Sequence, residues 1–179
     1  VGGATGDWNT TSNWSGGIVP TSADAVTLSS TTGSFVVTLQ TGQTANFASL
    51  VIGGDSTYFV STTLIGNLGT AGAITVATKG ELRQKNNVSQ TLTGDLIVQS
   101  GGMLTHEENT ASHSYSVYFV ADDIDVQAGG TIDVDSRGYG GAGVFSEGNG
   151  PSGGTVGNGG SYNRGGGGGH GGSGGAGFA

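Results

Sequence analysis

The sequence predicts an all-β protein, a right-handed parallel β-helix with an N-terminal cap and a glycine-rich C-terminal segment. Three observations predict this fold: a repeat of apolar pairs, short alternating strands that end in glycine corners, and a composition that disfavours helix. The apolar pairs recur at steps of 24, 24, 22 and 28 residues, which suits the coils of a solenoid. They are Val26/Leu28, Leu50/Ile52, Ile74/Val76, Leu96/Val98 and Ile124/Val126.

Each coil is expected to contain two strands joined by a glycine corner. The stretches AITVATKGEL, DLIVQSGGML and DIDVQAGGTI alternate polar and apolar residues around glycine, as strands and tight corners do. Stacked coils of this kind lie about 4.8 Å apart and hydrogen-bond along the axis. A second apolar position, also expected in the core, follows each pair by eight or nine residues. These positions are Phe35, Phe59, Leu82, Leu104 and Ile132.

Further apolar residues indicate a third strand in each coil, and one coil carries an insertion. Apolar residues recur 14 and 18 positions after the leading residue in two coils, as Leu64 and Leu68 and then as Val88 and Leu92. Residues 105–116, with the sequence THEENTASHSYS, are polar and lack apolar alternation. They account for the longest step, so we expect them to loop out of the coil.

The composition excludes several classes of protein. The chain has 179 residues, of which 39 are glycine and 10% are charged, and no window shows helical apolar spacing. A net charge of −8 with only five Lys and Arg argues against nucleic acid and anionic membranes as partners. No run of about 18 apolar residues exists, so no membrane span is expected. The absence of cysteine fits an extracellular bacterial solenoid.

The chain divides into an N-terminal cap (residues 1–24), the coils (residues 25–136) and the glycine-rich segment (residues 137–179). Trp8 and Trp14 lie in the first part, among polar residues. A solenoid needs such a cap because the first coil would otherwise expose backbone groups and an apolar end. We expect both tryptophans to pack there, and the alternative is that they stack on sugar rings as glycan contacts.

About half of the positions in the glycine-rich segment are glycine, so it cannot form an ordinary core. It is either a flexible tail or a set of extended runs whose bare backbones hydrogen-bond side by side. We expect the ordered form and assign it a role in assembly. The residues expected to take part include Gly167, Gly172 and Phe178.

Two stretches of the chain resemble a known kind of protein. The opening GDWNTTSNWSGGIVPTSADAVTL resembles the W-x-x-x-x-N-W-x-x-G-x-x-P-x-x-x-D start of bacterial surface β-helix proteins that are similar to autotransporter passengers. The run from GGMLTHEEN to GGGGGHGGSGGAG looks like the glycine-rich segment of large secreted repeat proteins. This resemblance implies an extracellular or cell-surface location. It does not imply one activity, because adhesins, stalk proteins and polysaccharide-active enzymes share this architecture.

Acidic residues are densest near the last coil. Strand alternation is expected to point Asp123, Asp125, Asp133 and Asp135 outward. Carboxylates on neighbouring strands can chelate calcium, although the nonapeptide motif of calcium-binding β-rolls is missing. A solubilising face is the favoured interpretation, and calcium is the one cofactor that the sequence leaves open.

The predicted insertion contains a second group of candidate ligands. His106, Glu107, Glu108 and His113 could in principle bind a divalent metal. Their spacing differs from the metalloprotease motif, which needs two histidines four apart on one helix. A solvated polar loop is therefore the favoured interpretation.

The residues do not indicate an enzyme, and no catalytic residue is assigned. A polysaccharide lyase needs a basic groove, and this chain is acidic. A glycoside hydrolase needs two carboxyl groups in one cleft, a spacing that any acidic strand also provides. We expect an extracellular structural or adhesive β-helix that presents a rigid surface for self-association or for contact with matrix or glycans. The alternative is a lyase or glycoside hydrolase on the same fold.

Overall fold

The chain forms a β-solenoid of parallel strands in a computed structural model, which describes residues 5–55, 57–141, 146–151 and 153–154. It divides into two compact units, Val1–His106 with Ser116–Asp133, and Glu107–Tyr115 with Val134–Ala179. Every strand lies in the first unit, and the described residues contain no α-helix and no helix able to cross a membrane. The predicted all-β parallel solenoid is confirmed. Its right-handed sense and the capping role of residues 1–24 stay predictions.

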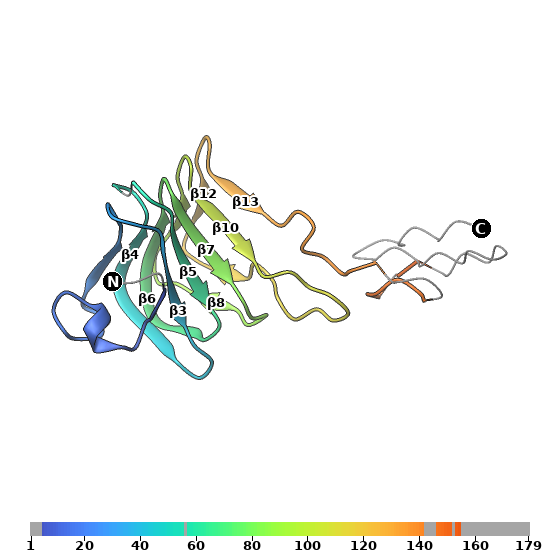
Figure 1. Ribbon diagram of the computed structural model, residues 1–179, viewed down its shortest axis with the longest axis horizontal. Coiled ribbons are helices and arrows are strands. Elements are labelled where there is room, and N and C mark those ends of the chain that lie inside the picture. The colour runs from blue at the N-terminus through green and yellow to red at the C-terminus, as the bar shows by residue number, and fades with distance from the viewer. Residues whose placement is uncertain (1–4, 56, 142–145, 152, 155–179) are drawn as a thin grey trace. The chain divides into compact units, whose positions relative to one another are not determined.

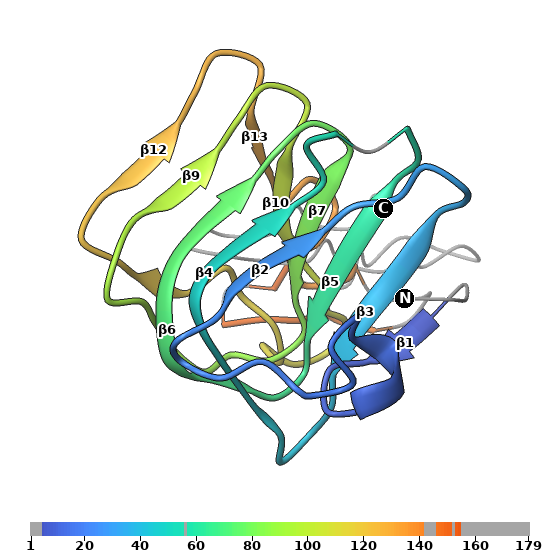
Figure 2. The same ribbon diagram turned by 90° about the vertical axis from the view of Figure 1, so that its left-hand side faces the viewer.

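Two large sheets and one small sheet form the sides of the coil (Figure 1), and Figure 2 shows the strands of each large sheet side by side. Sheet A contains, in spatial order, β1 (Thr5–Asp7), β3 (Phe35–Leu39), β5 (Val60–Leu64), β7 (Gly80–Gln84), β10 (Met103–His106) and β13 (Thr131–Asp133). Sheet B contains β12 (Ile124–Val126), β9 (Leu96–Val98), β6 (Asn67–Val76), β4 (Thr44–Ile52) and β2 (Ala25–Leu28). Sheet C pairs β8 (Gln90–Thr91) with β11 (Phe119–Val120), and the short 3-10 helix η1 (Thr11–Asn13) follows β1.

The repeated apolar pairs stack on one another within sheet B. Their leading residues form one row and their second residues form a parallel row, through β2, β4, β6, β9 and β12. In the first four of these strands every residue of the pairs is at most 6% exposed. Alternate residues of a strand project to the same face, so this packing follows directly from the apolar spacing. The predicted register of sheet B is confirmed.

The register of sheet A differs from the prediction in its first strands. Leu82 and Leu104 stack in one inward row as expected, but the row continues to Thr62 and Val37. Phe59 precedes β5 and is 41% exposed, so its predicted core position is wrong. The two corners differ in length, because seven residues (53–59) separate β4 from β5 and only three (77–79) separate β6 from β7. A constant offset from sheet B therefore reaches β7 but stops short of β5.

The third side and the insertion follow the prediction in part. Leu92, which follows β8, is 4% exposed, whereas Val88 is 47% exposed and does not enter the core. Residues 107–118, between β10 and β11, contain no strand. An insertion without strands is therefore present, but its predicted bounds of 105–116 are wrong at the start, because Thr105 and His106 are buried in β10.

Candidate functional site

The last coil leaves apolar side chains uncovered. Ile124 pairs in register with Leu96, yet Leu96 is 0% exposed and Ile124 is 52% exposed. In the same way Ile132 is 43% exposed although its partner Leu104 is 1% exposed. These residues occupy the expected inward rows but are not buried, because no described strand stacks on them. We call this surface the open end, and it consists of Ile124, Val126 and Ile132.

The backbone is also uncovered at the open end. β12 is the last strand of sheet B and β13 is the last strand of sheet A, so each has one neighbour among the described residues. An edge strand presents a row of N–H and C=O groups to any chain that can add a strand. The open end therefore combines apolar side chains with edges suited to strand pairing.

Two tryptophans pack over the first coil. Trp8 is 1% exposed, with its ring centroid 5.9 Å from that of Phe47 and 4.9 Å from that of Trp14. The Trp14 Nε1–H donates to the Trp8 carbonyl oxygen at 2.7 Å. This burial removes Trp8 from the candidates for sugar stacking. Trp14 is half-buried and lines a groove of about 520 Å³ with Ile18 and Val26, so its glycan contact stays a prediction.

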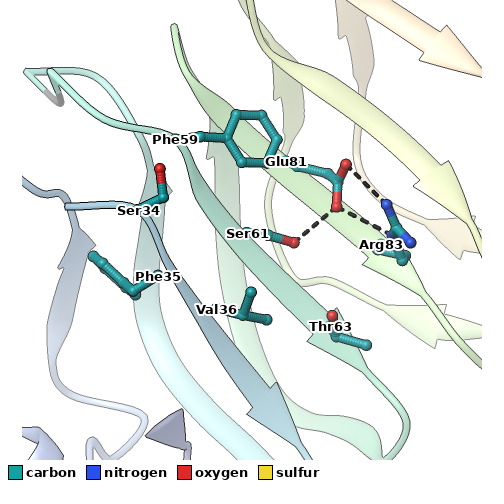
Figure 3. A pocket seen from close by; sticks show the side chains of 8 residues that line it. All are labelled: Ser34, Phe35, Val36, Phe59, Ser61, Thr63, Glu81 and Arg83. Carbon is teal, nitrogen blue, oxygen red and sulfur yellow. Dashed lines mark hydrogen bonds and ion pairs between the residues drawn. The ribbon is translucent and has the colours of Figure 1, made fainter. Parts of the chain in front are cut away.

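A second hollow, of about 340 Å³, opens on the outer face of sheet A (Figure 3). β3, β5 and β7 form its floor, and Figure 3 shows the Phe59 ring beside the carboxylate of Glu81. We call it the Phe59 pocket. Its lining residues are Ser34, Phe35, Val36, Phe59, Ser61, Thr63, Glu81 and Arg83.

Glu81 places a buried carboxylate in this pocket, although the residue is only 3% exposed. Its Oε1 accepts hydrogen bonds from Ser61 Oγ at 2.8 Å and Arg83 Nε at 3.1 Å, and its Oε2 accepts one from Arg83 Nη2 at 3.2 Å. Strand geometry creates this group, because Ser61 pairs with Glu81 across the sheet and Arg83 lies two residues further on the same face. A buried charge of this kind costs several kcal/mol unless it is paired and hydrogen-bonded.

The acidic residues considered for calcium do not gather at one point. Asp125 lies on β12 of sheet B with Asp123 just before that strand, whereas Asp133 lies on β13 of sheet A. Asp135 belongs to the second unit. Across the part of the chain that the structure describes, no group of three or more His, Cys, Asp or Glu is placed to hold a metal. Calcium binding by these residues therefore stays a prediction.

The candidate ligands of the insertion are distributed over both units. His106 ends β10 in the first unit and is 8% exposed, while Glu107, Glu108 and His113 belong to the second unit. Asn109 organises the loop, because its Oδ1 accepts hydrogen bonds from the Ser114 and Tyr115 N–H groups at 2.7 and 2.9 Å. These local hydrogen bonds agree with a polar loop.

The glycine-rich segment is described only in part. Gly140 donates its N–H to the Thr110 carbonyl at 2.9 Å, and a Cβ at Gly153 would lie on the Gly148 carbonyl oxygen. Gly167, Gly172 and Phe178 lie outside the described residues, so their role in assembly stays a prediction.

Comparison with protein-family models, with curated proteins and with solved structures finds no match for this chain.

Proposed function

We propose that this chain is an extracellular structural or adhesive β-solenoid of the bacterial surface type, which presents a rigid surface and associates with further copies of itself. Parallel strands hydrogen-bonded along the whole stack supply the rigidity. Its surfaces would then contact matrix or glycans. No side chain has to perform chemistry in such a role.

The uncovered last coil is the observation that carries self-association. Leu96 and Ile124 occupy the same row of sheet B, and they differ only in whether another strand lies above them. Full burial of an exposed Val or Ile side chain contributes about 1.5–3 kcal/mol. The three side chains of the open end are 42% to 52% exposed, so covering each would contribute about half of that amount. A second copy that brings its own open end would cover both surfaces at once, in a two-fold contact.

Charge predicts how this association responds to salt. Asp123 and Asp125 flank Ile124 in the sequence, and the whole chain has a net charge of −8. Two open ends that meet would bring like charges together, and salt screens such repulsion over about 10 Å at 0.1 M. Self-association should therefore strengthen as the salt concentration rises.

Light scattering after size-exclusion chromatography tests this proposal directly. The full chain should show a molar mass that rises with protein concentration, and Ile124→Asp should remain monomeric. Ile18→Asp is the matched control, because Ile18 is also exposed, at 72%, but lies outside the open end. A wild-type chain that stays monomeric at every concentration, or an Ile124→Asp variant that still associates, would contradict the proposal.

The alternative of a polysaccharide-active enzyme gains nothing from the pocket described above. Glycoside hydrolases use two carboxyl groups in one cleft. Glu81 is the single acidic residue that lines the Phe59 pocket. A binding role therefore fits this surface better than hydrolysis.

A further inference from the structure

We infer that the Phe59 pocket binds one ring of a neutral saccharide, which extends the proposed role in glycan contact to a defined site. The inference depends on that proposed function only for its biological setting. Four features of the pocket carry it: a fixed carboxylate, an aromatic wall, balanced charge and a volume suited to one ring.

The carboxylate of Glu81 is a preorganised acceptor for a hydroxyl group. A carboxylate offers about four acceptor positions. Ser61 Oγ and Arg83 Nε occupy two positions at Oε1, and Arg83 Nη2 occupies one at Oε2. One acceptor position therefore remains, at Oε2. Because its neighbours already hold the side chain, a sugar hydroxyl would gain a charge-assisted hydrogen bond without having to order it.

Phe59 supplies the apolar surface that a pyranose ring needs. Its side chain is at the pocket rim in Figure 3, and the residue is 41% exposed. A flat aromatic ring suits the C–H face of a sugar, while the hydroxyl groups on the ring edge reach polar partners. A single exposed Phe would need no explanation by itself. The combination with a recessed carboxylate is what indicates a ligand.

Charge and size narrow the class of saccharide. Glu81 and Arg83 form an ion pair at 3.1 Å, so the two charged residues lining the pocket sum to zero. The net charge of −8 would repel a polyuronate, which leaves a neutral sugar as the fitting ligand. A pocket of about 340 Å³ is at the small end of ligand sites, which suits one ring rather than a long chain.

Saturation-transfer NMR and calorimetric titration of the full chain test the assignment. The probes are the methyl glycosides and short neutral oligosaccharides of glucose, galactose, mannose and N-acetylglucosamine, with oligogalacturonate as the anionic probe. We expect at least one neutral series to bind and oligogalacturonate to bind more weakly. Phe59→Ala should weaken binding at least tenfold. Tyr58→Ala should change it less than twofold, because Tyr58 is equally exposed at 42% but does not line the pocket.

Ser61→Ala gives a second readout. This variant keeps the Phe59 ring in place and removes one of the hydrogen-bond donors that fix the Glu81 carboxylate. We expect it to bind saccharide more weakly while its circular dichroism spectrum shows an unchanged fold. The titrations are repeated on Ile124→Asp, so that loss of self-association is separated from loss of saccharide binding. The inference is overturned if no neutral probe binds at about 10 mM. Tighter binding of oligogalacturonate, or wild-type affinity in Phe59→Ala, would overturn it as well.

Discussion

Lys79 and Gly101 occupy equivalent corners of successive coils, and both have left-handed backbones. The N–H of Lys79 donates to the carbonyl oxygen of Gly101 at 3.1 Å, and their φ angles are 65° and 73°. Gly101 in turn donates to Gly129, whose φ is 84°. Lys79 thus has the left-handed backbone that glycine has at positions 101 and 129 of the next two coils.

Lys79→Gly should stabilise the protein. The left-handed conformation costs a residue with a Cβ about 1–2 kcal/mol, and glycine avoids this cost. Glycine in turn loses about 0.5–1 kcal/mol more in backbone entropy on folding, which offsets part of the gain. The expected gain in the free energy of unfolding is therefore about 0.5–1 kcal/mol, measured by urea denaturation. Lys79→Ala is the control, because it removes the amine and keeps the Cβ. An equal gain in both variants would show that the Lys side chain, and not the backbone, is unfavourable.

Gly102→Ala should destabilise the stack for a different reason. A Cβ at Gly102 would overlap the Val76 carbonyl oxygen of the coil below, so the two coils would have to separate. Overpacking of this kind typically costs about 1–3 kcal/mol. Gly33→Ala is the matched control, because nothing lies within 4 Å of its Cβ position. Equal thermal midpoints for the two variants would contradict the close approach of the coils at this corner.

The sequence was sufficient to predict the rows of sheet B and of the later strands of sheet A, but not those of the first strands of sheet A. The pairs that begin with Leu50 and Ile74 are anchored by their own alternation, which depends only on neighbouring residues. A constant offset from Leu50 predicts a core position for Phe59. Such an offset cannot detect that one corner is longer than the next, and a single-residue slip moves a side chain to the opposite face.

The Phe59 pocket could not be predicted without that register. Glu81 and Arg83 are separated by one residue, so strand alternation alone places them on the same face. Ser61 joins them only because β5 and β7 pair with an offset of 20 residues. The role of Trp8 could not be predicted for another reason. Packing in the cap and stacking on a sugar ring differ in whether the side chain is buried, and the sequence alone does not show the burial of one tryptophan.

Thr62→Val should stabilise the core. Thr62 is 0% exposed in the row between Val37 and Leu82, and within the described residues its hydroxyl has no hydrogen-bond partner. Val has nearly the same shape and removes the buried polar group, so we expect a gain of about 1 kcal/mol. Thr38→Val, on the half-buried outer face, should change stability by less than about 0.5 kcal/mol. A loss of stability in Thr62→Val would indicate that the hydroxyl is satisfied, for example by water.

Val98→Asp and Val126→Asp should differ sharply although the two residues are register partners. Val98 is 0% exposed, so an unpaired carboxylate there would cost several kcal/mol and unfold the stack. Val126 is 42% exposed, and the same change should leave a folded protein. Circular dichroism and amide NMR dispersion measure both outcomes. A soluble, folded Val98→Asp variant would contradict the core register.

The last prediction concerns an amide network that links three coils. Asn86 donates from Nδ2 to the Ile65 and Gly66 carbonyl oxygens at 3.1 and 2.9 Å, and its Oδ1 accepts a hydrogen bond from Gln84 Nε2 at 2.8 Å. Gln84 Oε1 in turn accepts from the Tyr118 N–H at 2.8 Å. Asn86 is therefore both a donor to the coil below and an acceptor within its own coil.

Asn86→Asp should destabilise the protein by about 1–3 kcal/mol near neutral pH, because an ionised carboxylate would face the two carbonyl oxygens without a donor. The retained oxygen would still accept hydrogen bonds from Gln84, Val88 and Gln90, which favour the charged form. We expect the repulsion from the two carbonyl oxygens to be the larger effect, so that it raises the pKa of the introduced carboxyl above its unfolded value of about 3.9. The folded state then holds the proton more tightly than the unfolded state. The difference from wild type should consequently be smallest below about pH 4 and grow as the pH rises through the raised pKa. Asn67→Asp, at an exposed position of β6, should show no such trend in urea denaturation across the same pH range. A pH-independent loss in Asn86→Asp would mean that the introduced carboxyl had turned away from Ile65 and Gly66 into solvent.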